Sequence, residues 1–477
     1  MFKQFVIGVL SIGAMPAMAA EWFVSPSGND SSGTGSATSP FRTVRRVLDT
    51  SIGVANAGDT ITLRAGTYNE CDVRLRKPLT LRSYSGERAH IHCDITVPDS
   101  VVVQIDRAAS GSRLAGLELS GGMYYGVMLQ TDWWGAGDTG TGPSNIVLED
   151  LYVHDTGRDG IKLTPRTNQV TIRRNEIGHT GAAEAPGTPL DYRNADGIDM
   201  VNVQNVTIED NYIHDISTTG LYFKGGSTDV VVQRNRIENT GMAGILAGFD
   251  TSVEFFDLAV NPHYYEAIRG KVINNFVRNT DYEGIGMYSA QSPLIANNTI
   301  VDTAKVGHSA IYYGVPAQDW DPNAERPATT GAIVRNNLVI QDGGTCVEIR
   351  WFRDLDASGL TGSPDLDYNA YYDRSGSCRF VDNRPGTPDG IRNDNGTRGG
   401  NFALWRSLEN ADAHSFETVL SVDAAGHLPQ GSPAIKAGQA LSQFSDDIER
   451  QPRSAPYDIG AHEASPPPEA VFQNGFD

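Results

Sequence analysis

Short apolar segments recur along most of the chain, and each is followed by a turn and a second short apolar segment. Six of the first segments align in one frame, with an asparagine near the end of each: Val170–Ile177, Val206–Ile213, Val230–Ile237, Gly270–Val277, Pro293–Ile300 and Ala332–Val339. The shorter spacings between them are about two dozen residues, and the longer ones contain extra loops. Short strands that repeat at this period, with turn residues between them, predict the coils of a right-handed parallel β-helix.

The aligned segments share a column of asparagines: Asn175, Asn211, Asn235, Asn275, Asn298 and Asn337. Asparagine side chains stacked at a tight turn can hydrogen-bond to one another along the axis of the coil, and asparagine accepts a left-handed backbone. We interpret this column as part of the scaffold rather than as a functional site.

Alternation of inward and outward positions assigns the two faces of the second strand in each unit. The first and third residues after a small residue are apolar and are expected in the core: Ile161 and Leu163, Ile198 and Met200, Leu221 and Phe223, Ile245 and Ala247, Ile285 and Met287, Ile311 and Tyr313, Val347 and Ile349. The residues between them form one outward column: Lys162, Asp199, Tyr222, Leu246, Gly286, Tyr312 and Glu348. A second outward column contains Thr164, Val201, Lys224, Gly248, Tyr288, Gly314 and Arg350, and a third begins with Asp159 and Asp196.

The two ends of the chain depart from the repeat. Residues 1–19 are expected to be a cleaved secretory signal, with Lys3 before the apolar run Phe5–Ile12 and a small-residue cleavage motif at Ala17 to Ala19. Residues 20–464 are expected to form the β-helix domain, in which a segment of about 20–70, with a helix from about Phe41, caps the first coil. Residues 465–477 form a proline-rich tail. We therefore expect a secreted protein, extracellular or periplasmic, without a membrane span.

Composition and charge narrow the class further. The 51 glycines favour a turn-rich, all-β protein: a single-stranded right-handed parallel β-helix with an N-terminal capping helix and inserted loops. The formal net charge of -20 argues against a nucleic-acid partner. It also disfavours direct binding of an acidic polymer unless metal ions intervene. A monomer is expected.

The chain contains four cysteines, in two pairs that are each about one repeat apart. Cys71 with Cys93 and Cys346 with Cys378 could each bridge neighbouring coils, so two disulfides are predicted. The alternative, four buried free thiols, is less common in exported proteins.

Three aspartates, Asp159, Asp196 and Asp199, are expected to converge on one outward face, because neighbouring strands lie about 4.8 Å apart. Clustered carboxylates repel one another unless a cation pairs them, and oxygen ligands on rigid strands suit Ca²⁺. The sequence therefore predicts a calcium site. The alternative is a surface ion pair between Asp199 and Lys162, its neighbour in the same column, which would contribute little.

Lys224 ends an apolar strand and is followed by two glycines. It is expected on the order of 8 Å from Asp199, one strand further along and two residues displaced. Gly225, Gly226 and Gly248 would leave space around the end of its side chain. A lysine beside bound cations loses its proton more readily and can act as a general base. The alternative is a surface lysine that only aids solubility.

Two segments on consecutive coils, NADGIDM at Asn194–Met200 and GLYFKGG at Gly220–Gly226, carry a resemblance to a known family. They resemble, in the same order, the calcium-binding segment and the lysine-containing segment of the family 9 polysaccharide lyases. This family consists of parallel β-helix enzymes that cleave pectic polysaccharides. The resemblance implies calcium ligands at Asp159, Asp196 and Asp199 and a catalytic base at Lys224.

The chain departs from the family pattern at Ala195, where the family has an aspartate that Asp191 could replace here. The lysine also falls later after the preceding glycine than it does in the family. The implied reaction is calcium-dependent β-elimination in an acidic polysaccharide such as pectate. An arginine could assist at the sugar carboxylate, and the candidates are Arg193, Arg269 and Arg350.

Other functions on the same scaffold stay open, because the fold alone does not choose among them. They are an alginate or glycosaminoglycan lyase, a C5 epimerase, a glycoside hydrolase that uses the aspartates, and a non-catalytic adhesin or glycan-binding protein. The insertion Glu254–Ala267 and the outward tyrosines Tyr288 and Tyr312 could line a sugar-binding groove or cover open core.

Overall fold

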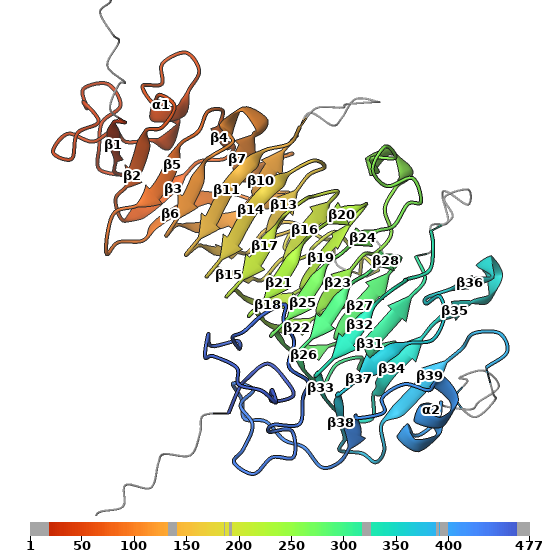
Figure 1. Cartoon of the computed structure of the whole chain (residues 1–477). Coiled ribbons are helices and arrows are strands. Elements are labelled where there is room, and N and C mark those ends of the chain that lie inside the picture. The colour runs from red at the N-terminus through yellow and green to blue at the C-terminus, as the bar shows by residue number, and fades with distance from the viewer. Residues whose placement is uncertain are drawn as a thin grey trace, which may run out of the picture.

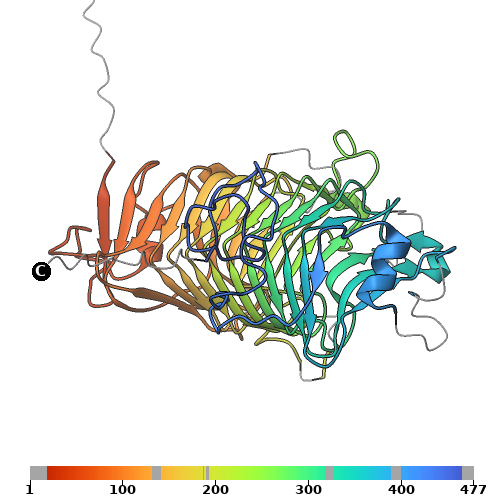
Figure 2. The same ribbon diagram turned by 60° about the horizontal axis from the view of Figure 1, so that its bottom comes forward.

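Three long parallel β-sheets run side by side along the chain and enclose one elongated core (Figure 1). The computed structural model describes residues 19–131, 141–185, 187–189, 193–316, 326–387, 391 and 399–464. The chain visits the three sheets in turn, and the coils stack from the N-terminal to the C-terminal end (Figure 1, Figure 2). The predicted fold class, an all-β right-handed parallel β-helix, is confirmed.

We number the sheets in the order in which a coil visits them. Sheet 1 contains β1 (Glu21–Val24), β2 (Thr60–Leu63), β5 (Thr80–Ser83), β8 (Arg113–Ala115), β11 (Ser144–Glu149), β14 (Asn168–Arg173), β17 (Thr207–Glu209), β21 (Val231–Gln233), β25 (Lys271–Ile273), β29 (Leu294–Ala296), β32 (Ile333–Arg335) and β37 (Asp365–Asp367). Sheet 2 contains β3 (Gly66–Asn69), β6 (Ala89–Cys93), β9 (Glu118–Gly121), β12 (Tyr152–His154), β15 (Glu176–Gly178), β18 (Tyr212–Ile216), β22 (Arg236–Thr240), β26 (Phe276–Thr280), β30 (Thr299–Val301), β33 (Leu338–Gln341), β38 (Ala370–Asp373) and β40 (Phe416–Glu417).

Sheet 3 is the sheet that carries the predicted site. It contains β4 (Val73–Leu75), β7 (Val101–Asp106), β10 (Tyr125–Gln130), β13 (Ile161–Leu163), β16 (Ile198–Val201), β19 (Leu221–Lys224), β23 (Ile245–Ala247), β27 (Ile285–Tyr288), β31 (Ser309–Gly314), β34 (Thr345–Ile349) and β39 (Arg379–Asp382). Two small sheets decorate the coils: β20 (Ser227–Thr228), β24 (Ala267–Ile268) and β28 (Ala290–Gln291), and the pair β35 (Trp351–Phe352) and β36 (Ala357–Ser358).

The predicted inward positions of sheet 3 form the core. All fourteen of them, from Ile161 to Ile349, are fully buried at 0% exposure. The first inward residues stack in register along the sheet, as in the pairs Ile161 with Ile198 and Ile198 with Leu221. Burying one such aliphatic side chain stabilises the fold by about 1.5–3 kcal/mol, so the repeated columns account for the regularity of the coil.

The asparagine column forms a continuous ladder at the corner between sheets 1 and 2. Each amide donates to the next side-chain oxygen along the axis, for example from Asn211 Nδ2 to Asn235 Oδ1 at 2.9 Å and from Asn235 Nδ2 to Asn275 Oδ1 at 3.0 Å. The ladder extends one step beyond the prediction, to Asn369. The left-handed backbone belongs to the residue before each asparagine, such as Arg234 with a φ of 55°.

Replacing Asn235 with alanine is expected to lower the free energy of unfolding by about 1–3 kcal/mol. The side chain is fully buried, and its Oδ1 accepts from both the backbone N–H and the side chain of Asn211. Chemical denaturation would measure the change, with Asn69→Ala on an exposed strand position as control. Equal stability of the two variants would show that the ladder does not stabilise the coil.

Short helices close the two ends of the coil. The helix α1 (Val44–Leu48) begins three residues later than predicted, after the N-cap Thr43, and buries Val44 and Val47 in the main core. The helix α2 (Phe402–Glu409) lies near the opposite end and places Trp405 in the same core. The predicted N-terminal cap is therefore present, and the chain has a second cap that the repeat did not predict.

Both predicted disulfides are present, Cys71–Cys93 and Cys346–Cys378. Each joins neighbouring coils, since Cys93 ends β6, the partner of β3, and Cys346 lies on β34, the partner of β39. The predicted signal, apart from residue 19, the predicted tail and Asp191 lie outside the described residues. In the described part of the chain, no helix has the length and hydrophobicity needed to cross a bilayer.

The segment after β40 folds back over the corner between sheets 1 and 2, where Figure 2 shows it in dark blue across the middle coils. It is held there mainly by the side chains just before the ladder asparagines. Asn274 Nδ2 donates to the carbonyl of Asp446 at 2.8 Å, and Asn297 Nδ2 donates to the carbonyl of Asp458 at 2.8 Å. Asn336 Nδ2 donates in the same way to Gln439, and Arg234 pairs with Asp446.

Candidate active site

Three adjacent strands of sheet 3, β13, β16 and β19, and the residues just before β13 and β16 carry the predicted site. Lys162 pairs in register with Asp199, and Asp199 pairs with Tyr222. Val201 pairs with Lys224 in the next outward column. These pairs match the outward columns expected from the sequence, and they bring the lysines and aspartates to one face of the coil.

Asp159, Asp196 and Asp199 meet in a buried cluster, with one carboxylate oxygen of each within 4.8 Å of the others. Their exposed fractions are 0%, 4% and 1%. Asp159 Oδ1 accepts from the backbone N–H of Asp196 at 3.0 Å. Asp196 Oδ1 accepts from the Thr218 hydroxyl at 2.6 Å and the Thr219 N–H at 2.9 Å. Asp159 Oδ2 and Asp199 Oδ1 are buried and accept no hydrogen bond from the described residues.

Lys162 lies in the same cluster and forms an ion pair with Asp199. The ion pair considered as an alternative to a metal site therefore exists, but it is buried, with the two side chains 12% and 1% exposed. Burial raises the pKa of Asp159 to about 7, although the charge of Lys162 opposes this shift. Burial likewise lowers the pKa of Lys162 to about 8. One ammonium group thus compensates the three carboxylates only in part.

The cluster fits a calcium ion by its chemistry. The candidate ligands are oxygens, two of them lack a hydrogen bond in the described structure, and Ca²⁺ prefers carboxylates in a loose shell. When ionised, the three carboxylates carry more negative charge than the one ammonium group paired with them, and a divalent cation would balance this excess. Asp159, Asp196 and Asp199 are thus suited to hold such an ion, with Lys162 beside it.

Lys224 lies at the end of β19, half-buried, with its Nζ 4.4 Å from the centre of the Tyr222 ring and 5.4 Å from that of Phe249. Among the described residues its ammonium forms no ion pair. Its charge nevertheless reaches the cluster, because it opposes the rise in the pKa of both Asp159 and Asp196 that burial causes. The aromatic contacts hold the side chain beside the cluster without occupying its nitrogen.

The two glycines after Lys224 are required by the backbone conformation of the turn, and not to leave space around the end of the lysine side chain. Gly225 and Gly226 have φ values of 68° and 89°, in the left-handed region that favours glycine. The Gly225 N–H donates to Glu266 Oε2 at 2.8 Å, and the Gly226 N–H donates to the Glu266 carbonyl at 2.9 Å. Glu266 is buried in an ion pair with Arg326. The sharp turn therefore ends the strand at Lys224 and fixes it to the inserted loop.

A cavity of about 560 Å³ opens next to the cluster on sheet 3. Its lining includes Lys162, Arg158, Tyr124 and Phe255, so the predicted insertion Glu254–Ala267 does contribute to the wall. Arg158 stacks over the Tyr124 ring at 4.5 Å and pairs with no carboxylate of the described residues. Sequence reasoning missed Arg158 because it lies on a turn outside the strand columns, although it directly precedes Asp159.

None of the three arginines predicted as substrate contacts lines this cavity. Arg193 donates to the Thr188 carbonyl at 2.9 Å. Arg269 forms a two-point ion pair with Asp229 at 2.8 and 2.6 Å. Arg350 lies four strands along sheet 3 from Lys224, on the order of 19 Å away. Arg158 is therefore better placed than these three to meet an anionic group beside Lys162.

The outward tyrosines form an apolar layer on sheet 3. Tyr222, Tyr288 and Tyr312 are 4%, 7% and 2% exposed and pack with Leu246 and Phe249. This burial agrees with a role of Tyr288 and Tyr312 in covering the strands. It does not agree with an exposed platform on which a sugar could stack.

Comparisons with known proteins agree with this architecture. A family model described as "Right handed beta helix region" matches residues 131–257. The crystal structure of pectate lyase Pel9A aligns with a TM-score of 0.54 and 16% identity, over 94% of this chain and 96% of that chain. At this identity the similarity establishes the fold, so the chain is a right-handed parallel β-helix protein whose function must be argued from its site.

Two further structures align with this chain less closely. The A-module of mannuronan C-5 epimerase AlgE6 from Azotobacter vinelandii has a TM-score of 0.43 and 15% identity, over 69% of this chain and 84% of that chain. PfbA, a surface adhesin of Streptococcus pneumoniae, has a TM-score of 0.47 and 14% identity, over 72% of this chain and 90% of that chain. These two similarities are too weak to support a function. No curated protein sequence matches the chain.

Proposed function

We propose that the protein is a secreted polysaccharide lyase that cleaves a uronic-acid polymer of the pectate type by β-elimination. The observation that supports this most is the position of Lys224, whose nitrogen lies free of carboxylates in the described structure beside a buried aspartate cluster with two unsatisfied oxygens. The two disulfides agree with an exported protein. The shared fold with a pectate lyase is consistent with the proposal.

In this proposal Asp159, Asp196 and Asp199 hold Ca²⁺. The bound ion would neutralise the uronate carboxylate, where negative charge accumulates when the C5 proton is removed. Arg158 and Lys162, which line the adjacent cavity, would bind anionic groups of the same polymer. Together, Ca²⁺, Arg158 and Lys162 would offset the electrostatic repulsion between an acidic protein and an acidic substrate.

Lys224 would take the proton. In its amine form it accepts the C5 proton of the uronate, and the electron pair forms the C4–C5 double bond as the bond from C4 to the glycosidic oxygen breaks. The leaving oxygen gains a proton from water, so the products are an unsaturated uronate and a new hydroxyl end. The turn at Gly225 and Gly226 fixes the position of the base for this transfer.

The same cluster suits an inverting glycoside hydrolase less well. Such enzymes hold their two carboxyl groups about 6.5–9.5 Å apart to leave room for a water molecule. Here the carboxylate oxygens lie within 4.8 Å of one another. The spacing therefore favours a shared cation over an attacking water.

A polymer panel tests the proposal. The purified protein would be incubated with polygalacturonate, alginate and glycosaminoglycans, with calcium or with a chelator. A calcium-dependent rise in ultraviolet absorbance from the unsaturated product on one polymer is the expected result. New reducing ends without this absorbance would instead identify a hydrolase. If both signals are absent on every polymer, the result would argue against an enzymatic role on these substrates.

Without calcium, stability is expected to fall as the pH rises from about 4 to about 7. The pKa of Asp159 is raised from 3.8 to about 7 by burial, so across this window the folded state holds a proton that the unfolded state has released. The free energy of unfolding then falls by up to about 1.4 kcal/mol per pH unit. Urea denaturation in chelator would measure this loss. Asp159→Asn should reduce this loss, and Glu409, whose pKa burial also raises to about 7, should account for part of what is left. Asp229→Asn, at an exposed pair, should leave the loss unchanged.

A further inference from the structure

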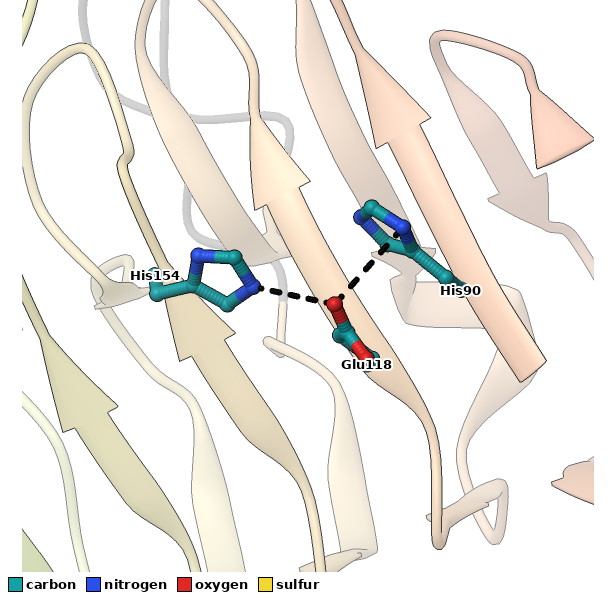
Figure 3. Close-up of side chains that lie close together, drawn as sticks. All are labelled: His90, Glu118 and His154. Atoms are coloured by element: carbon teal, nitrogen blue, oxygen red, sulfur yellow. Dashed lines mark hydrogen bonds and ion pairs between the residues drawn. The ribbon is translucent and has the colours of Figure 1, made fainter. Parts of the chain in front are cut away.

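Two histidines and a glutamate gather on sheet 2, on a different sheet from the candidate active site. His90 on β6, Glu118 on β9 and His154 on β12 come from three consecutive strands and point toward one another (Figure 3). His154 Nε2 lies 3.3 Å and His90 Nδ1 lies 3.6 Å from the same oxygen, Glu118 Oε1. The three side chains are 13%, 24% and 27% exposed for His154, His90 and Glu118, so they are partly shielded from water.

These separations are those of ligands around one small metal ion. A zinc ion with ligands at about 2.0–2.1 Å in tetrahedral geometry places its ligand atoms about 3.3 Å apart. The two observed spacings of 3.3 and 3.6 Å are close to that value, and all three ligand atoms lie within 4.8 Å of one another. Two imidazoles and one carboxylate are also ligand types that zinc takes.

The outer nitrogen of each histidine already has a partner that fixes its ring. His154 Nδ1 lies 2.7 Å from Asp155 Oδ2, and His90 Nε2 lies 2.7 Å from Ser120 Oγ. Metal-binding histidines are oriented by such contacts, in which the outer N–H donates to an oxygen. If the outer nitrogens carry the protons, the inner nitrogens of two neutral rings direct lone pairs at a carboxylate. A metal ion at the centre would satisfy that arrangement at a pH where both rings are neutral, whereas protonated rings would instead donate directly to Glu118.

We propose that His90, Glu118 and His154 form a zinc-binding site, with water in the fourth position. The ion would join three successive coils near the N-terminal end of the β-helix, so its binding would stabilise those coils. The site shares no residue with the Asp159–Asp196–Asp199 cluster. The inference therefore stands independently of the proposed lyase activity.

Zinc titration of the full-length protein tests the site. The protein would be stripped with chelator and titrated with zinc chloride by calorimetry at neutral pH, in excess calcium to occupy the aspartate cluster. We expect one tight zinc ion per chain and a higher unfolding temperature with zinc. Glu118→Gln, which keeps the shape of the side chain, and the double variant His90→Ala/His154→Ala should bind zinc at least tenfold more weakly.

His427 is the control for zinc bound elsewhere, because with Glu449 and His462 it forms a second group that could hold a metal ion. Its ring lies between two carboxylates, Asp423 and Glu449, on turns of the C-terminal segment, and 42% of its side chain is exposed. His427→Ala should leave the tight zinc binding and the thermal shift unchanged. Three outcomes would each overturn the proposal. The native protein binds no zinc, the folded Glu118→Gln and double variants bind zinc as well as the native protein does, or His427→Ala loses zinc binding. Circular dichroism would confirm that each variant is folded.

Discussion

Lys224→Ala is expected to lower the rate of polymer cleavage by roughly 100- to 10,000-fold, the usual contribution of a general base. The fold should survive, because the ammonium forms no ion pair with the described residues and its removal therefore breaks no direct pair, although it takes away a charge that favours the ionised forms of Asp159 and Asp196. The rate of unsaturated product formation would measure the loss. Lys271→Ala, a half-buried lysine on β25 of sheet 1, is the matched control and should retain full activity.

Lys224→Arg separates a base from a fixed positive charge. Arginine keeps the charge beside the aspartate cluster but does not release its proton in proteins. The proposed mechanism requires this variant to be as inactive as the alanine variant. Substantial activity in Lys224→Arg would mean that the residue acts only through its charge and that another group takes the proton.

The double variant Asp159→Asn/Asp199→Asn is expected to bind calcium at least tenfold more weakly and to lose calcium-dependent activity. These two side chains carry the buried oxygens that lack hydrogen bonds in the described structure. Calorimetric titration with calcium would measure the change in affinity, separately from any assay of activity. Asp229→Asn removes an exposed carboxylate and should leave calcium binding as it is.

The same double variant is expected to change stability differently with and without the ion. In chelator, Asp199→Asn breaks the buried ion pair with Lys162 and leaves that ammonium group poorly compensated, so the variant should be less stable than the native protein. With calcium, the native protein should gain stability and the variant should not. A native protein whose stability is indifferent to calcium would contradict the proposed site.

The repeat made the regular part of the fold predictable from the sequence. Inward and outward positions follow from the period of two, and a fixed register between coils places Asp199 next to Lys162 and Lys224 next to Val201 without further information. The asparagine ladder and both disulfides follow for the same reason. Residues at equal positions in successive coils must be neighbours.

The features that break the repeat were not predictable in this way. Arg158 lies on a turn, and Glu266 reaches Gly225 from a loop about forty residues later in the chain. The burial of Lys162 depends on surrounding side chains that periodicity does not specify, so the sequence could only suggest a surface pair. These contacts determine the chemistry of the site.

The C-terminal segment bears on how the β-helix unfolds. A solenoid whose coils contact only their neighbours can lose them one at a time from either end. Here Arg234, Asn274, Asn297 and Asn336, on four successive coils, all bond to that one segment. None of these coils can open without also breaking its bond to the segment. They should behave as a single cooperative unit, while the coils near β1 fray independently.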